Sequence, residues 1–103
     1  AKLDPSCPRE LLQEFVRAAG DRIREFKTQE LSNTTWAFAT LGICDAEFFH
    51  KAEEEVIFKS PALKAQGLSN LAWAFAKSSV GGMELFHTIS LEATRQLSEL
   101  SAQ

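Results

Sequence analysis

Apolar residues recur along the chain at helical spacing, and one pattern is written twice. The segment TQELSNTTWAFATLG at 28–42 returns 37 residues later as AQGLSNLAWAFAKSS at 65–79. We therefore predict two helices of one type, over 28–41 and 65–78, which we call A-type helices. At about 100° per residue, matching positions fall on one apolar side that is expected to face the core. These positions are Leu31, Thr35, Phe38 and Ala39 in the first copy and Leu68, Ala72 and Phe75 in the second.

A second apolar pattern of helical period flanks the A-type segments and predicts three B-type helices. The three copies place their residues at the same relative positions. They are Leu11, Leu12, Phe15, Ala19, Ile23 and Phe26; then Phe48, Phe49, Ala52, Val56, Ser60 and Leu63; then Leu85, Phe86, Ile89, Ala93, Leu97 and Leu100.

Several residues mark where these helices begin and end. Proline disfavours helix at the residue before it, so Ser60-Pro61 should end the middle B-type helix near Lys59. Asp45 is the expected N-cap of that helix. Gly42 and Gly81-Gly82 are expected to end the two A-type helices.

Short connections between A-type and B-type helices predict antiparallel αα-hairpins. One hairpin cannot bury its own apolar face, so the repeat favours an all-α solenoid of about five helices, in the order B-A-B-A-B. We assign 8–28 to the second helix of a preceding unit, 29–65 to the first full unit and 66–102 to the second. Another copy of the pattern would begin where the chain stops, so 1–103 is expected to be one segment of a longer array.

The side of the A-type helices opposite the core is polar in both copies, and we call it the polar stripe. It consists of Gln29, Asn33 and Thr40 in the first copy and Gln66, Asn70 and Lys77 in the second. One helix type commonly lines the concave binding surface of stacked repeats, so the stripe is the candidate binding surface. Lys27 and Lys64 are expected to add positive charge to it.

Three pairs of equivalent residues near the stripe leave two interpretations open. Asn33 and Asn70 fit either an amide ladder along the stack or contact with a ligand edge. The equivalent positions 40 and 77 carry different residues, Thr40 and Lys77. Either a unit-by-unit recognition code or drift at a solvated position would produce this difference. Trp36 and Trp73 are expected to pack between neighbouring A-type helices, and the alternative is stacking on a nucleobase.

Composition limits the function classes. The chain has 103 residues, 45% hydrophobic and 24% charged, as in a folded soluble domain, and its net charge is −3 without a polybasic patch. Tight nonspecific phosphate binding by this segment alone is therefore not expected. No apolar run reaches the roughly 20 residues of a membrane span. The N-terminal residues have the features of neither a signal peptide nor a transit peptide.

No pattern of catalytic residues is present, so we expect neither an enzyme nor a bound metal or cofactor. Cys7 and Cys44 are expected to be reduced thiols. His50 and His87 occupy equivalent positions, but no further ligand completes a metal site. The run 53–55 of three glutamates is interpreted as a solvated helix face.

The segments LSNTTWAFATLG and LSNLAWAFAKSS, followed by EFFH and ELFH, resemble the octotricopeptide repeat family. The W-A-F-A form is similar to versions in algal and dinoflagellate proteins, and related repeats accompany RAP domains in apicomplexans. The resemblance implies an organellar protein, of chloroplast or mitochondrion, that binds single-stranded RNA in its maturation, stability or translation. It implies RNA contact on the A-type side, over 28–41 and 65–78. The lead-in rich in proline that often precedes the family's unit is reduced here to Pro61.

Two main functional hypotheses remain, beside a weaker third in which the segment only supports a catalytic domain elsewhere in a longer protein. The first is an RNA-binding solenoid segment that uses the polar stripe, with about one base per unit and hence weak binding by this segment alone. The second is a protein-interaction or structural scaffold of the HEAT or armadillo kind, which the acidic balance favours. Apolar surface at the ends of such a segment would also favour protein partners or self-association.

Overall fold

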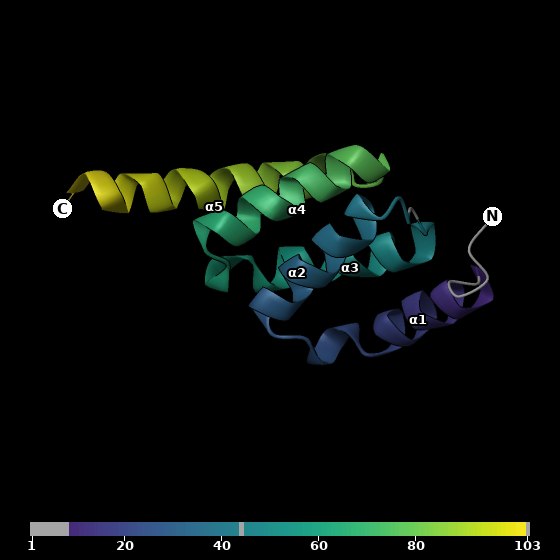
Figure 1. Ribbon diagram of the computed structural model, residues 1–103. Coiled ribbons are helices and arrows are strands. Elements are labelled where there is room, and N and C mark those ends of the chain that lie inside the picture. The colour runs from purple at the N-terminus through teal and green to yellow at the C-terminus, as the bar shows by residue number, and fades with distance from the viewer. Residues whose placement is uncertain (1–8, 44, 103) are drawn as a thin grey trace.

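A computed structural model describes residues 9–43 and 45–102, and these residues are almost entirely helical (Figure 1). The helices are α1 (Arg9–Asp21), α2 (Thr28–Thr40), α3 (Ala46–Lys59), α4 (Ala65–Ser78) and α5 (Met83–Ala102), with short 3-10 helices η1 (Ile23–Glu25) and η2 (Ser60–Ala62). The all-α class is therefore confirmed, and the five helices fall where the A-type helices (α2, α4) and the B-type helices (α1, α3, α5) are expected. Within the described ranges, no helix combines the length and the apolar character that crossing a bilayer requires. Both cysteines lie outside the described residues.

Helices of the same type lie side by side. α2 packs against α4, α1 packs against α3, and α3 packs against α5. Within each hairpin, α2 also contacts α3 and α4 contacts α5, so A-type and B-type helices form two layers (Figure 1). The molecule is elongated, with principal extents of 53 × 24 × 23 Å.

The core lies between the two layers. The predicted core positions of α2 are all buried, and in α4 Leu68 and Phe75 are buried while Ala72 is half-buried. Phenylalanine rings contact one another edge to face across α1, α2, α3 and α4, which adds to the energy of area burial. The centroid distances are 5.8 Å for Phe15–Phe38, 4.9 Å for Phe38–Phe48, 5.5 Å for Phe48–Phe49 and 5.5 Å for Phe49–Phe75.

The B-type helices end differently from one another. The N-terminal cap of α3 is confirmed, since the Asp45 Oδ1 accepts a hydrogen bond of 2.8 Å from the Phe48 N–H, and α3 ends at Lys59 as predicted. The continuous helix expected through Phe26 is wrong, because α1 ends at Asp21 and η1 follows. η1 and η2 occupy positions 37 residues apart, and η1 contains no proline. The 3-10 turn therefore belongs to the unit and does not depend on Pro61.

The A-type helices also end in two ways. Gly42 has a positive φ of 80° just beyond α2, as a C-terminal glycine stop requires. In α4 the predicted stop at Gly81-Gly82 is wrong by a few residues, because Ser79 adopts the left-handed conformation at φ 60°. Gly81 instead turns the chain toward α5 at φ 116°, where an added Cβ would lie 2.8 Å from Leu85 Cδ2.

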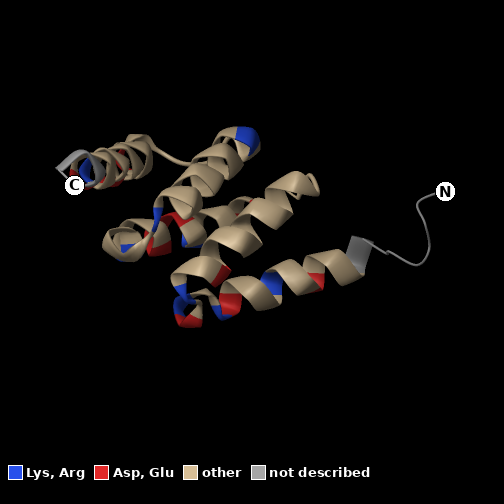
Figure 2. Ribbon diagram, turned by 60° about the vertical axis from the view of Figure 1, so that its left-hand side comes forward, with Lys and Arg blue, Asp and Glu red and all other residues tan. Residues whose placement is uncertain are grey.

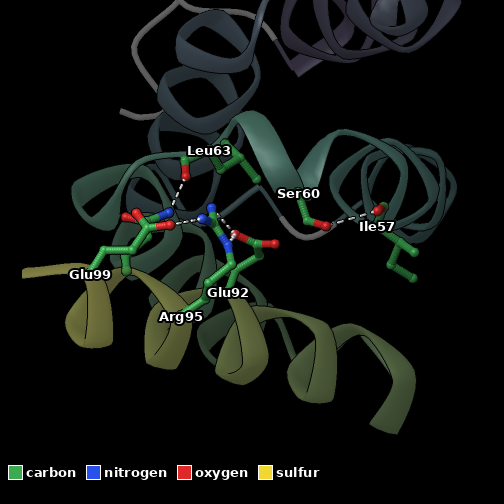
Figure 3. A network of polar contacts seen from close by, with 7 residues as sticks. Ile57, Ser60, Leu63, Glu92, Arg95 and Glu99 are labelled. Carbon is green, nitrogen blue, oxygen red and sulfur yellow. Dashed lines mark hydrogen bonds and ion pairs between the residues drawn. The ribbon is translucent and has the colours of Figure 1, made fainter. Parts of the chain in front are cut away.

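A repeated hydrogen bond closes each hairpin. The Lys59 Nζ of α3 donates to the Phe26 carbonyl at 2.8 Å, just before α2 begins. At the position 37 residues later, the Gln96 Nε2 of α5 donates to the Leu63 carbonyl, just before α4 (Figure 3). Each B-type helix thus holds the extended residue that leads into the A-type helix of its own hairpin.

The prediction that the glutamate run 53–55 is a solvated helix face is wrong for two of its three residues. Glu55 is half-buried and lies 3.0 Å from the Lys59 Nζ. The half-buried Glu53 accepts a hydrogen bond of 3.1 Å from the Gly82 N–H, at the start of α5. Only Glu54 is exposed. Glu55 therefore pairs within α3, whereas Glu53 links α3 to the residue just before α5.

Candidate nucleic-acid interface

The A-type layer contains a hollow of about 420 Å³ between α2 and α4. We call it the inter-helix hollow. It is lined by Thr28, Gln29, Ser32, Asn33, Leu63, Lys64, Gln66, Gly67 and Asn70. Equivalent residues of two units meet there because α2 and α4 lie side by side. Five of the eight predicted polar and basic candidates are thereby brought together: Gln29, Asn33, Lys64, Gln66 and Asn70.

The hollow lies at the N-terminal halves of both helices. In α2 the first turn is closed by Glu30, whose Oε1 accepts a hydrogen bond of 2.8 Å from the Lys27 N–H. Gly67 takes the equivalent position in α4 and has no side chain to place there; an added Cβ would lie 3.4 Å from Ser32 Oγ. Ser32 Oγ itself donates to the Gln29 carbonyl of its own helix at 3.2 Å. Gly67 therefore adds no side chain to the hollow, unlike Glu30 at the equivalent position of α2.

The amide side chains of the hollow are free to contact a ligand. Gln29, Asn33 and Gln66 are exposed and Asn70 is half-buried. Within residues 9–43 and 45–102, no hydrogen bond joins Asn33 to Asn70 or occupies the side chains of the two glutamines. An amide ladder is therefore not formed, and the amides keep both donors and acceptors for base edges.

Trp36 and Trp73 form a pair beside the hollow. Their ring centroids lie 6.3 Å apart with a tilt of 42°, so the predicted packing between neighbouring A-type helices is confirmed. The two rings are not buried, since Trp36 is 42% and Trp73 46% exposed. The Lys77 Nζ lies 5.8 Å from the Trp73 ring centroid, within reach of a cation–π interaction.

Three candidates lie outside the hollow. Thr40 and Lys77 are exposed at the C-terminal halves of α2 and α4, beyond the tryptophan pair. At 1.5 Å per residue, the stripe from Gln29 to Thr40 extends roughly 16 Å along the helix. Lys27 is exposed before α2 but does not line the hollow. Among the lining residues that sequence reasoning missed, only Gly67 carried a signal, as a glycine inside a helical pattern.

The electrostatics of the hollow differ from those of the whole chain. Of the described residues that line it, Lys64 is the one cation and none is acidic. The N-termini of α2 and α4, which begin there, add partial positive charge. Elsewhere Lys and Arg alternate with Asp and Glu (Figure 2). The resolved pKa shift lies outside the residues that line the hollow: the hydrogen bond and charge of Glu92, with the charge of Glu99, raise the pKa of Arg95.

In the described part of the chain, no three His, Cys, Asp or Glu side chains cluster as a metal site would require. His50 is exposed and lies 3.7 Å from a Glu53 carboxylate oxygen. The chain matches no family model, no curated protein and no solved structure. The similarity of its W-A-F-A segments to octotricopeptide repeats therefore stays a prediction from those residues.

Proposed function

We propose that the chain is a segment of an α-solenoid that binds single-stranded RNA along its A-type layer. The observation that carries the proposal is the inter-helix hollow, where amides from two units meet beside Lys64 and the half-exposed tryptophan pair. Amides can donate to and accept from base edges, and indole faces stack on bases. A lysine without an acidic neighbour in the hollow can neutralise a phosphate.

The arrangement of helices supports the solenoid. Each unit places its A-type helix beside the A-type helix of the next, and each B-type helix beside the next B-type helix. Reading of about one base per unit, as in other helical RNA-binding arrays, gives two units a site of about two nucleotides. Binding by this segment should therefore be weak and should strengthen as units are added. The resemblance suggests organellar RNA as the target, in a chloroplast or a mitochondrion.

The test is titration of fluorescently labelled single-stranded RNA pools, with anisotropy as the readout. We expect binding that weakens with salt, at a shallow slope of about −0.7 per phosphate contact. The double variant Asn33→Ala, Asn70→Ala and the variant Lys64→Gln should each weaken it. Lys51→Gln is the matched control, because Lys51 contacts Asp21 and Glu47 away from the hollow.

Two outcomes would contradict the proposal. One is that neither the chain nor a longer array of W-A-F-A units shows salt-dependent RNA binding. The other is that Lys51→Gln weakens binding as much as Lys64→Gln.

A protein-interaction scaffold is the second candidate. The net charge of −3 and an apolar groove at the α5 end of the molecule favour it. On that hypothesis the double variant Asn33→Ala, Asn70→Ala would leave binding to any partner unchanged, because neither residue lines the groove, and substitutions in the groove would abolish it.

A further inference from the structure

The inter-helix hollow is formed by two units together. α2 contributes Gln29 and Asn33, and α4 contributes their equivalents Gln66 and Asn70. Residues four apart are neighbours on a helix surface, so each helix brings a pair of amides to the same space. The volume of about 420 Å³ lies within the roughly 300–1,000 Å³ of sites that hold small ligands. Neither helix forms this space alone.

The two asparagines line one space because α2 and α4 bury different sides of the motif. α2 buries Ser32, the residue before Asn33, whereas α4 buries Leu71, the residue after Asn70. Asn70 is accordingly half-buried, while Asn33 is exposed. The asparagines are equivalent in sequence, but they belong to one inter-unit site and not to two separate ones.

The tryptophan pair is also shared by the two units. Its ring centroids lie 6.3 Å apart, a distance typical of direct aromatic contact. Two rings in contact leave no room for a base between them, so the half-exposed pair offers one stacking surface and not one per unit. Trp36 and Trp73 follow Asn33 and Asn70 by three residues, so this surface lies about one helical turn beyond the amides.

The charge of the hollow comes from one of the two units. Lys64 lines the hollow, but its equivalent Lys27 does not. Lys64 precedes α4, and Trp73 lies nine residues further along, which is roughly 14 Å at the helical rise. The hollow therefore has one place for a phosphate, at Lys64, and one place for a base, toward the tryptophan pair, with the amides between them.

We propose that a nucleotide is bound between two units, and that its base is read jointly by Asn33 and Asn70. Such joint reading rests on the proposed RNA binding and concerns how that same site recognises its ligand. In a long array the count stays close to one base per unit, but the residues that set base preference come from two neighbouring helices.

A double-mutant cycle measures whether the two asparagines act on one nucleotide. Asn33→Ala, Asn70→Ala and the double variant are titrated with short labelled single-stranded RNA homopolymers, with anisotropy as the readout. Each single variant should weaken binding about three- to tenfold, as for the loss of one hydrogen bond. The double variant should be no weaker than about either single one, because a base that is released by one amide no longer contacts the other. Independent contacts would instead multiply the two losses.

Asn33→Ala combined with Thr40→Ala is the matched control cycle. Thr40 is exposed on the same helix, seven residues from Asn33, and does not line the hollow. The two positions are roughly 10 Å apart along α2, so any losses there should multiply. Circular dichroism verifies that all variants are folded.

Nuclear magnetic resonance of the side-chain amides gives a second readout. In the unsubstituted chain, RNA should shift the Asn33 and Asn70 side-chain signals along one common saturation curve. In Asn33→Ala, the RNA-induced shift of Asn70 should largely disappear, although Asn70 itself is unchanged.

Three outcomes would overturn joint reading. The first is salt-dependent RNA binding that Lys64→Gln weakens but in which the losses at Asn33 and Asn70 multiply; RNA binding itself would then stand. The second is a full RNA-induced shift of Asn70 in Asn33→Ala. The third is that this chain, which contains a complete inter-unit site between α2 and α4, binds no RNA although a longer array of W-A-F-A units does.

Discussion

α2 and α4 carry nearly the same sequence motif, but beyond their shared apolar side each buries positions that the other leaves exposed or half-buried. α2 buries Ser32 and Ala39 against the next unit, whereas the equivalent Ser69 and Ala76 of α4 are exposed. α4 buries Leu71 and Ser78, but the equivalent Thr34 and Leu41 of α2 are half-buried and exposed. Burial in this repeat is therefore set by which neighbour is present, and not by the motif alone.

The same comparison separates architecture from candidate function. Neither packing side includes the tryptophan pair, which remains about half exposed in both helices. Gln29 and Gln66 are likewise exposed in both. The surface that stays open whether a unit lies inside the stack or at its end is thus the surface available to a ligand.

The largest predicted effect is a difference between equivalent residues of the two A-type helices. Leu71→Ala should destabilise the protein by about 2–5 kcal/mol, because it removes a fully buried side chain and leaves a cavity. Thr34→Ala, at the equivalent position of α2, should change stability by no more than about 0.5 kcal/mol. Urea denaturation followed by circular dichroism measures both, in dilute protein. Equal losses would show that the two helices do not pack differently.

A smaller effect is expected at the hydrogen bond that closes the first hairpin. Lys59→Leu removes the donor to the Phe26 carbonyl and leaves Glu55 half-buried without its cation. The expected loss is about 1.5–3 kcal/mol, as for hydrogen bonds that involve charged groups. Lys59→Gln should cost less, because Gln96 makes the equivalent bond in the second hairpin. If glutamine is no better than leucine at this position, the bond does not stabilise the hairpin.

The smallest predicted effect is a gain in stability at Thr35. Its Oγ1 is buried and, among the described residues, has no hydrogen-bond partner. Thr35→Val keeps the shape and removes the hydroxyl, so it should stabilise the fold by about 1 kcal/mol. The melting temperature should then rise by roughly 4–8 °C. Ala72→Thr is the reciprocal change in α4; since Ala72 is half-buried, little change is expected there.

The sequence predicted the helices because the apolar period and the 37-residue repeat are both local signals. It placed Leu31, Phe38 and Phe75 in the core and located the Asp45 cap correctly. It did not predict the 3-10 turn at Ile23–Glu25, which depends on packing between hairpins and has no proline to mark it. The burial of Glu53 was missed for the same reason, since its partner, the Gly82 N–H, lies outside α3. Glu55 pairs with Lys59 four residues on in its own helix, a spacing that the sequence did show.

The candidate site was predictable in part. Helical spacing alone put Gln29, Asn33, Gln66 and Asn70 on one side of their helices. It could not show that α2 and α4 enclose a hollow there, because that depends on the distance between helices. Nor could helical spacing show that Thr40 and Lys77, which belong to the polar stripe, lie outside the hollow and beyond the tryptophan pair.

Intrinsic fluorescence tests the proposed RNA site most directly, because the chain contains two tryptophans and no tyrosine. Trp36 and Trp73 follow Asn33 and Asn70 of the hollow by about one helical turn, so RNA bound along the A-type layer should alter their emission. We predict quenching that follows the anisotropy of labelled RNA and is reversed by salt. Binding by anisotropy without any change in tryptophan emission would place the RNA elsewhere and contradict the account.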